Sequence, residues 1–295
     1  MRHPGQASVI TGPEKDVQGV EHVYADIRNV AELGAALDGA TSLIHLAAIL
    51  RERRGATLAT VNEEGAANVY EAAAHAGIGR AVHVSVVGAA EDSPAPYMAS
   101  RWRGEQIALK SEVTPSILRL SALFGEGDEF TNALAAFVRL GPLMVVAGSG
   151  KTLFQPLAAD DAAEAIARAI ANPNESPVER GQTVELGGPE AMTYNDIADA
   201  IAQAMGRRLV KLHMPIALPT PVVKFMNLVL STPPVTTSQL QMLRLNNIPQ
   251  GRSTEDIFGF SPVPMSGNID YVRRVGYREA LQIVAGRMPA YIRDH

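Results

Sequence analysis

The sequence predicts an α/β protein: a doubly wound parallel sheet followed by a smaller, mostly helical C-terminal lobe. Through the first two thirds of the chain, short β-rich runs alternate with alanine-rich helical patterns. This alternation is typical of βαβ units, in which crossover helices cover both faces of a parallel sheet. From Met192 onward, proline-punctuated helical patterns take over and no strand alternation is expected to return. We therefore expect two domains, at residues 1–190 and 191–295.

Five runs are expected to form strands, because each is short, apolar and bounded by turn-type residues. They cover residues 20–25, 42–47, 81–86, 116–120 and 183–186.

Four segments are expected to form helices, and each carries a local signal. The first spaces small apolar side chains three and four positions apart, and Gly77 follows as its stop. The last begins at Thr193, a plausible cap, with Asp196 three residues later. The four helices cover residues 58–76, 95–109, 160–170 and 193–205.

Composition indicates a folded protein and excludes several classes of function. The chain has 295 residues, 46% of them hydrophobic, and a formal net charge of -5 with acids and bases mixed. No broad positive field exists to attract nucleic acid. The absence of cysteine removes thiolate catalysis, thiolate metal sites and disulfides, and the seven histidines show no metal-ligand spacing. The first residues lack the apolar core of a secretory signal, so we expect a cytoplasmic protein.

Two glycine-containing segments resemble phosphate-binding loops only superficially. Residues 148–152 read Gly-Ser-Gly-Lys-Thr, but the first glycine of a P-loop would fall at Val145. Residues 153–159 also read as a strand, whereas a P-loop needs a helix there. We predict a turn between two strands instead. Gly77 and Gly79 follow a helix and precede a strand, the reverse of the order that a dinucleotide-binding turn requires.

Residues 214–230 form the most apolar stretch of the chain. They contain Pro215, Pro219, Pro221 and Lys224 and are shorter than the roughly 20 residues that span a bilayer. An apolar run of this length is rarely left bare. We expect it to pack into the core of the lobe, the alternative being a peripheral membrane or protein contact.

Small and polar residues follow the ends of the predicted strands, where open α/β sheets bind ligands. The first strand closes on Asp26 and Ile27, and the second ends in Ala47 and Ala48. The third strand ends near Ser85. The next helix then carries a tyrosine and an arginine four residues apart, Tyr97 and Arg101.

The order of these blocks resembles the extended and atypical short-chain dehydrogenases/reductases, a family of NAD(P)-binding Rossmann proteins. It continues through residues 117–128, 154–166 and 185–194, so the resemblance covers roughly residues 19–260. No single block is decisive, but their joint order is specific. The subgroup it resembles most is the nucleotide-binding accessory subunit of respiratory complex I and its bacterial relatives.

The resemblance implies where a dinucleotide would lie. Asp26 and Ile27 would contact the adenine, and Leu46, Ala47 and Ala48 would line the adenosine and pyrophosphate. The nicotinamide would be surrounded by Ser85, Tyr97, Arg119, Leu120 and Ser121.

Tyr97, Arg101 and Ser85 would be the catalytic residues, but two of the positions depart from the family pattern. In catalytic members a lysine four residues after the tyrosine holds the ribose and lowers the pKa of the phenol, so that tyrosinate can act as a base. Arg101 occupies that position and has a planar fork instead of a compact ammonium. The partner serine or threonine falls near Val87, which is apolar. The residues also admit simpler roles: a core tyrosine at Tyr97, and strand-end caps at Asp26 and Ser85.

The third departure concerns the phosphate loop. The family pattern places a strand, a glycine-rich turn and a helix before the position that Arg2 and His3 resemble, where this sequence begins. That turn holds the pyrophosphate through backbone N–H groups. We expect residues 1–295 to bind NAD(H) or NADP(H) far more weakly than a version preceded by those elements. Arg2 is at a position where its side chain could bind the 2'-phosphate of NADP, which favours NADP slightly over NAD.

Three functions are compatible with these observations. The leading hypothesis is an NAD(P)-binding protein with weak or no redox catalysis, linked to quinone or respiratory-chain function as the resemblance implies. The alternatives are an active NAD(P)-dependent reductase, epimerase or dehydratase that uses Tyr97, and a cofactor-free scaffold or assembly protein. The expected partners are a dinucleotide and a small molecule, with no nucleic acid, no metal and no transmembrane span.

Overall fold

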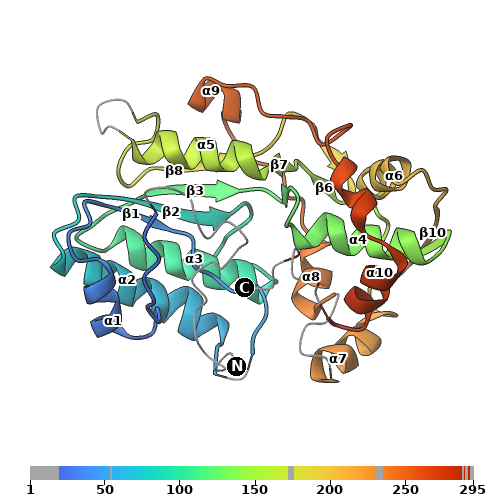
Figure 1. The fold of residues 1–295 in the computed structure, drawn as a ribbon, viewed down its shortest axis with the longest axis horizontal. Helices are drawn as coiled ribbons and strands as arrows, with labels where there is room; N and C mark the ends of the chain where they lie inside the picture. The colour runs from blue at the N-terminus through green and yellow to red at the C-terminus, as the bar shows by residue number, and fades with distance from the viewer. Residues whose placement is uncertain are drawn as a thin grey trace.

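The protein has a parallel sheet covered on both faces by helices, with a smaller lobe beside it (Figure 1). This computed structural model describes residues 20–53, 55–171, 176–229, 235–287, 289 and 292. The predicted α/β class is confirmed.

The central sheet has the strand order β1-β2-β3-β8, and all three pairings are parallel. Its strands are β1 (Ser42–His45), β2 (Arg80–Val86), β3 (Ser116–Leu120) and β8 (Thr183–Leu186), which match four of the predicted runs. The fifth prediction, a strand over 20–25, is wrong: these residues pair with no strand among the described residues. Their β-branched and aromatic side chains favour an extended backbone, but a strand also needs a partner.

Helices cover the two faces of the sheet in the alternation that the sequence predicts. On one face lie α1 (Val30–Ala36), η1 (Ala59–Glu63) with α2 (Glu64–His75), and α3 (Pro96–Leu109). On the other face lies α5 (Ala159–Ile170), with α9 (Thr254–Phe258) beyond it.

The contact between η1 and α3 is so close that it requires a glycine. A Cβ atom built on Gly104 would lie well inside van der Waals distance of the backbone carbonyl oxygen of Asn62. Asn62 itself is fully buried and donates to Ser100 Oγ over 3.0 Å. Its side chain also bonds the backbone of Ile49 in both directions, which fixes the loop after β1.

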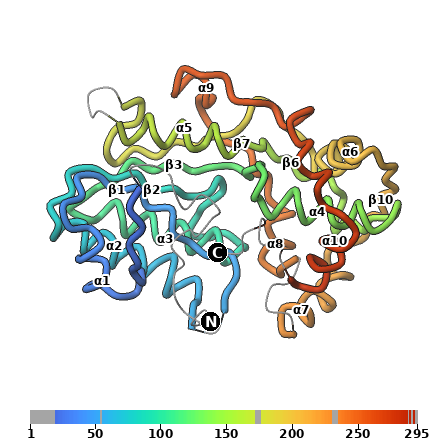
Figure 2. Tube along the Cα trace, in the orientation of Figure 1, coloured from blue at the N-terminus to red at the C-terminus, as the bar shows by residue number. Residues whose placement is uncertain are grey.

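The lobe has its own hydrophobic core, which draws on residues from both sides of position 190. The lobe contains α4 (Glu129–Leu140), β5 (Leu143–Ala147), α6 (Tyr194–Ala204), β10 (Val210–Met214), α7 (Thr220–Val229), α8 (Thr237–Met242), η2 (Asp270–Arg274) and α10 (Tyr277–Val284). Figure 2 shows that the first of these, α4 and β5, lie beside segments from the C-terminal third of the chain.

Three short pairings complete the fold. The expectation that no strand returns after Met192 is wrong, because β10 pairs with β5, and β9 (Met192–Thr193) pairs with β6 (Leu153–Phe154). Residues 210–214 do alternate, but the run is short and its partner lies far away in sequence. Residues 153–159 form no single strand: Gln155 and Pro156 separate β6 from β7 (Leu157–Ala158), which pairs with β4 (Leu123–Phe124).

The turn predicted at residues 148–152 is present between β5 and β6. Gly148 and Gly150 have φ angles of 85° and 68°, a conformation that favours glycine.

The apolar stretch does not pack into the core over its described residues, 214–229, so that expectation is wrong there. In α7 only Val223 is buried, while Phe225 and Leu228 are 66% and 84% exposed. The helix lies at the rim of the lobe and packs against α8 (Figure 1). No helix among the described residues is long and apolar enough to cross a membrane.

Candidate functional site

A cavity of about 410 Å³ lies where the carboxyl ends of β1, β2 and β3 meet the lobe. One wall comes from the strand ends and α3, and the other from α4, α8 and the segment after α8. This is the edge at which parallel α/β sheets bind ligands.

The structure brings most of the predicted site residues to this cavity. Its lining includes Leu46, Ala48, Ser85, Tyr97, Arg101, Leu120 and Ser121. Ala47 does not line it, and Arg2 lies outside the described residues. Arg119 points elsewhere and pairs with Glu105 and Glu185.

The residues predicted for the adenine end lie away from the cavity. Asp26 pairs with Arg28, which also donates its backbone N–H to the Asp26 carboxylate over 2.9 Å. The side chain of Ile27 is buried against Gly65 of α2, and its carbonyl accepts a hydrogen bond from Asn68 over 3.1 Å.

Tyr97 and Ser85 face the cavity with uncommitted hydroxyl groups. Tyr97 lies in the first turn of α3, which begins with Pro96 at a position where the missing N–H costs nothing. Among the described residues, the Tyr97 hydroxyl has no hydrogen-bond partner. Ser85 is buried near the end of β2, and its Oγ atom also has no partner. Both hydroxyls are therefore available to a ligand.

Arg101 lies one helical turn after Tyr97 and is directed at the interior of the sheet. It is 3% exposed, and one terminal nitrogen donates to the carbonyl oxygen of Val84. Within the part of the chain that the structure describes, its Nε atom has no partner. Burial lowers the pKa of both His45 and His83, and the charge of Arg101 lowers both further.

Two histidines lie side by side beneath the cavity on neighbouring strands. His45 of β1 is in register with His83 of β2, and their ring centroids are 4.9 Å apart. Burial, followed by the charge of Arg101, lowers the pKa of His45 to about 3. Burial, His45 and Arg101 also lower the pKa of His83 well below its ordinary value. Both rings are therefore neutral at pH 7, and the Tyr70 hydroxyl lies 3.3 Å from His83 Nδ1.

Asn247 lines the cavity and was not singled out from the sequence. Its Oδ1 atom accepts from the backbone N–H of Ala122 over 2.7 Å, and its Nδ2 atom donates to the carbonyl of Val87 over 3.2 Å. It thus joins the segment after α8 to the ends of β2 and β3. The surrounding residues, Leu-Asn-Asn-Ile-Pro, read only as a loop.

Arg51 and Glu129 connect the two walls. Arg51 follows β1, Glu129 is the first residue of α4, and their charged atoms are 2.8 Å apart. Apart from Gln239, Asn247 and the hydroxyl of Tyr194, the rest of the lobe wall is apolar. It includes Phe130, Ala133, Leu134, Phe137, Val235, Met242, Leu243 and Leu245.

The arrangement can hold a flat polar group against the sheet and an apolar molecule against the lobe. The described residues contain no cluster of His, Cys, Asp or Glu able to hold a metal ion.

Comparisons with known proteins agree with this geometry. Residues 6–187 match the model of the NAD-dependent epimerase/dehydratase family. A mitochondrial subunit of NADH dehydrogenase (1 alpha subcomplex subunit 9) from Arabidopsis thaliana is 30% identical over 205 residues, which cover 68% of this chain and 50% of that protein. A ceramide reductase from Caulobacter vibrioides is 29% identical over 198 residues, covering 66% of this chain and 61% of that protein. The chain thus spans about half the length of the plant relative.

Solved structures with the same fold include a quinone oxidoreductase of Escherichia coli bound to NADPH. Its TM-score is 0.67 at 19% sequence identity, over 86% of this chain and 84% of that one. A UDP-glucose 4-epimerase of Thermotoga maritima has a TM-score of 0.63 at 14% identity, over 86% and 83% of the two chains. At these identities the likeness concerns the fold. Since several curated relatives carry mitochondrial names, the expected cytoplasmic location stays a prediction.

Proposed function

Since this chain belongs to the NAD-dependent epimerase/dehydratase family, we propose that it binds NAD(P) along the carboxyl edge of its sheet and transfers hydride weakly or not at all. The family match confirms the resemblance predicted from the motifs and, with it, NAD(P) as the cofactor of the family. The quinone oxidoreductase structure of the same fold is a complex with NADPH.

The described residues fit the nicotinamide end of such a cofactor. Ser85 Oγ and Arg101 Nε are buried polar atoms without partners, and a buried polar group without a partner costs free energy. A carboxamide or ribose hydroxyl in the cavity would satisfy them. Ala48 at the end of β1 leaves room for a ring to lie against the strand ends. For the adenosine end, Asp26 and Ile27 remain our candidates.

Bound NAD(P) would supply hydride chemistry, and the weak point lies in the groups around Tyr97. In catalytic relatives of this type, a lysine ammonium next to the tyrosine favours the phenolate. Here Arg101 is buried and donates instead to the backbone carbonyl oxygen of Val84. This arrangement of Arg101 carries the proposal.

The position of the usual second hydroxyl supports the same conclusion. Val87 is buried, its backbone N–H donates to Leu120, and its carbonyl accepts from Asn247. Its apolar side chain can offer a substrate no hydrogen bond. Among the described residues of β2, Ser85 is our candidate for the hydroxyl partner of Tyr97.

The second ligand in this proposal is a largely apolar small molecule of the quinone kind. The lobe wall presents aromatic and aliphatic side chains, and its carboxylate Glu129 is already paired with Arg51. A nucleotide-sugar would need several cations for its phosphates, and the described lining offers Arg51 and Arg101. The names of relatives that act on NADH and quinones point the same way.

The cofactor part is tested by titrating the 295-residue chain with NADH and NADPH and following nicotinamide fluorescence. Ala48→Phe fills the proposed nicotinamide pocket and should weaken binding at least about tenfold. Ala191→Phe places the same ring at an exposed alanine outside the cavity and should leave binding unchanged. Because residues 1–295 are expected to bind weakly, the titration must reach roughly 1 mM dinucleotide; if neither dinucleotide binds saturably there, the cofactor-free scaffold becomes the better account.

An active reductase, epimerase or dehydratase is the second candidate, because the Tyr97 and Ser85 hydroxyls share one cavity and both are uncommitted. Turnover that disappears in Tyr97→Phe would establish it.

A further inference from the structure

The outward face of α7 is an apolar stripe that nothing in the described chain covers. Val222, Phe225 and Val229 recur at helical spacing and are 60%, 66% and 61% exposed. Leu218, just before the helix, continues the stripe, and Leu228 flanks it. We call these five residues the α7 stripe.

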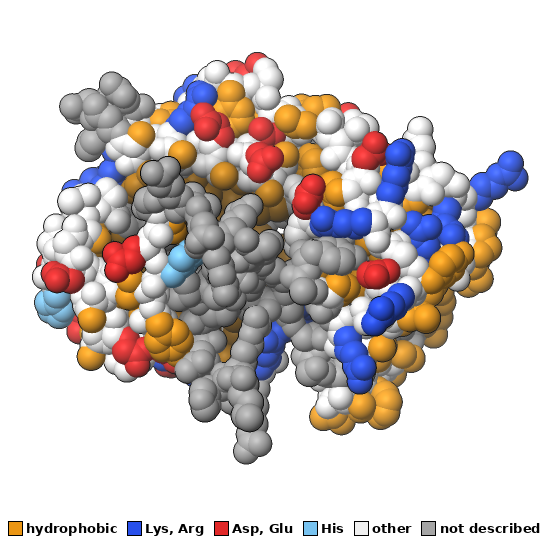
Figure 3. Space-filling view, viewed as in Figure 1, with side chains coloured by type: hydrophobic (Ala, Val, Ile, Leu, Met, Phe, Trp, Pro, Cys, Tyr) orange, Lys and Arg blue, Asp and Glu red, His pale blue; other side chains and the backbone are white. Residues whose placement is uncertain are grey.

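The apolar surface continues beyond the helix. β10 leads into α7, and the two-stranded sheet that β10 forms with β5 leaves one face open. Its exposed side chains are Leu143, Val145, Val210 and Leu212. In Figure 3, hydrophobic side chains gather at the lower right over α7 and follow the right edge of the lobe, with Lys and Arg side chains next to them.

The charge of this part of the chain has the opposite sign to the whole. Residues 200–254 contain six Lys and Arg residues and no Asp or Glu, although the full chain carries -5. Lys224 lies within α7 and is exposed. Lys224, Arg208 and Arg244 form no ion pair within the described residues.

We propose that the α7 stripe binds in the interface of an anionic lipid bilayer. A short helix with an apolar outward face, set in a segment that is basic and free of acids, complements both the acyl boundary and negative headgroups. Ten helical residues extend about 15 Å, so α7 lies along the surface and does not span the bilayer. Charge complementarity favours this occupant over a second copy of the chain, whose facing α7 would present the same positive charge.

The test is flotation of the purified full chain with phosphatidylcholine vesicles, and with vesicles in which one quarter of the lipid is phosphatidylglycerol. Binding should require the anionic lipid and weaken at high salt. Phe225→Ser with Leu228→Ser should lower the partition coefficient by at least about thirtyfold. Lys224→Gln should lower it about fivefold, and only on the anionic vesicles.

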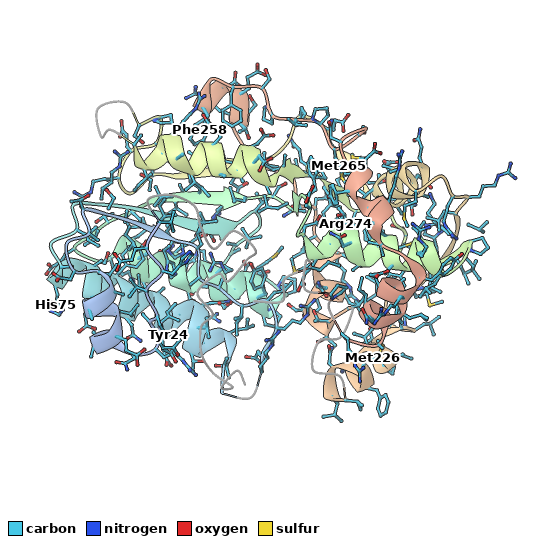
Figure 4. All side chains as sticks on the ribbon, in the orientation of Figure 1. Tyr24, His75, Met226, Phe258, Met265 and Arg274 are labelled. Atoms are coloured by element: carbon cyan, nitrogen blue, oxygen red, sulfur yellow. The ribbon has the colours of Figure 1, made fainter. Side chains whose placement is uncertain are left out.

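A matched pair of single variants distinguishes binding through the α7 stripe from non-specific hydrophobic binding elsewhere on the surface. Val222→Ser removes a valine from the stripe, whereas Val263→Ser removes a 40% exposed valine near Met265, which Figure 4 shows at the opposite edge of the lobe from Met226 of α7. Val222→Ser should weaken binding severalfold and Val263→Ser should not. Unchanged thermal unfolding would show that both variants are folded.

Complete exclusion of the wild-type chain from both kinds of vesicle would overturn the proposal. So would a dimer in sedimentation that Phe225→Ser with Leu228→Ser dissociates while flotation is absent, because a second copy would then cover the stripe. Neither result depends on whether the cavity binds NAD(P).

Discussion

The two walls of the cavity are built from different chemistry. The sheet wall carries the uncommitted polar atoms of Ser85, Tyr97 and Arg101, above the neutral pair His45 and His83. The lobe wall is lined by aromatic and aliphatic side chains. A ligand with one polar and one apolar side, or two ligands of opposite character, would satisfy both walls at once.

The walls also differ in how well they are fixed. Beneath the sheet wall, Asn62 and Gly104 hold the loop after β1, and buried side chains surround the histidines. The lobe wall continues through α8 to α7, a helix that buries a single residue. The sheet wall therefore positions most of the polar groups, while the lobe wall can vary its apolar contacts.

Acid should weaken the sheet wall most. The folded-state pKa values of His45 and His83 are lowered, so the unfolded chain binds more protons than the folded chain below about pH 6.5. Stability is therefore full above that pH and is lost as pH falls towards the folded value. Between pH 7 and pH 5 His45 should cost about 2 kcal/mol of unfolding free energy, measured by urea denaturation, and His83 should act in the same direction.

His45→Gln is the control for this effect. It should reduce the fall in stability between these pH values by the share of His45, about 2 kcal/mol. An equally steep fall in the variant would contradict the assignment of the acid sensitivity to the pair.

Gly104→Ala should be nearly as damaging, because the new Cβ atom would collide with the backbone of Asn62. We expect a loss of about 2 to 3 kcal/mol in unfolding free energy. Gly34→Ala is the matched helical control, since a Cβ atom there meets nothing and Gly34 has ordinary helical φ. That substitution should be neutral or slightly stabilising. Equal effects at both positions would mean that the close approach of η1 to α3 is not structurally important.

The smallest expected effect is on the affinity for one of the two ligands, because each wall is expected to bind a different ligand. Phe137→Ser removes an aromatic ring from the lobe wall and should weaken binding of decyl-ubiquinone about tenfold. Binding of NADPH should stay within about twofold of the wild type, because the sheet wall is intact. A parallel loss of both ligands would show that the walls do not act separately.

Local patterns in the sequence predict the sheet side well. Short apolar runs locate β1, β2, β3 and β8. Helical spacing and end signals locate η1 with α2, α3, α5 and α6 within a residue or two. Tyr97 and Ser85 then fall at the same edge because parallel strands end together.

The features that the sequence did not predict depend on contacts between residues far apart in the chain. β10 alternates over five residues, but only its pairing with β5 makes it a strand. Residues 20–25 show the reverse case, a strand-like pattern without a partner among the described residues. The role of Asn247 likewise depends on backbone atoms of Val87 and Ala122, far from it in sequence. The exposure of the outward face of α7 among the described residues could not be predicted either, because an apolar pattern does not say which side will be buried.

The most direct test of the central claim is the rate at which the protein oxidises bound NADPH when decyl-ubiquinone is added. The chain is first loaded with NADPH, and the loss of nicotinamide absorbance is followed in the wild type and in Tyr97→Phe. We predict saturable NADPH binding in both and the same slow oxidation in both, close to the rate without protein. A wild-type rate about a hundredfold or more above that of Tyr97→Phe would contradict the account, because a positioned acid or base contributes that much.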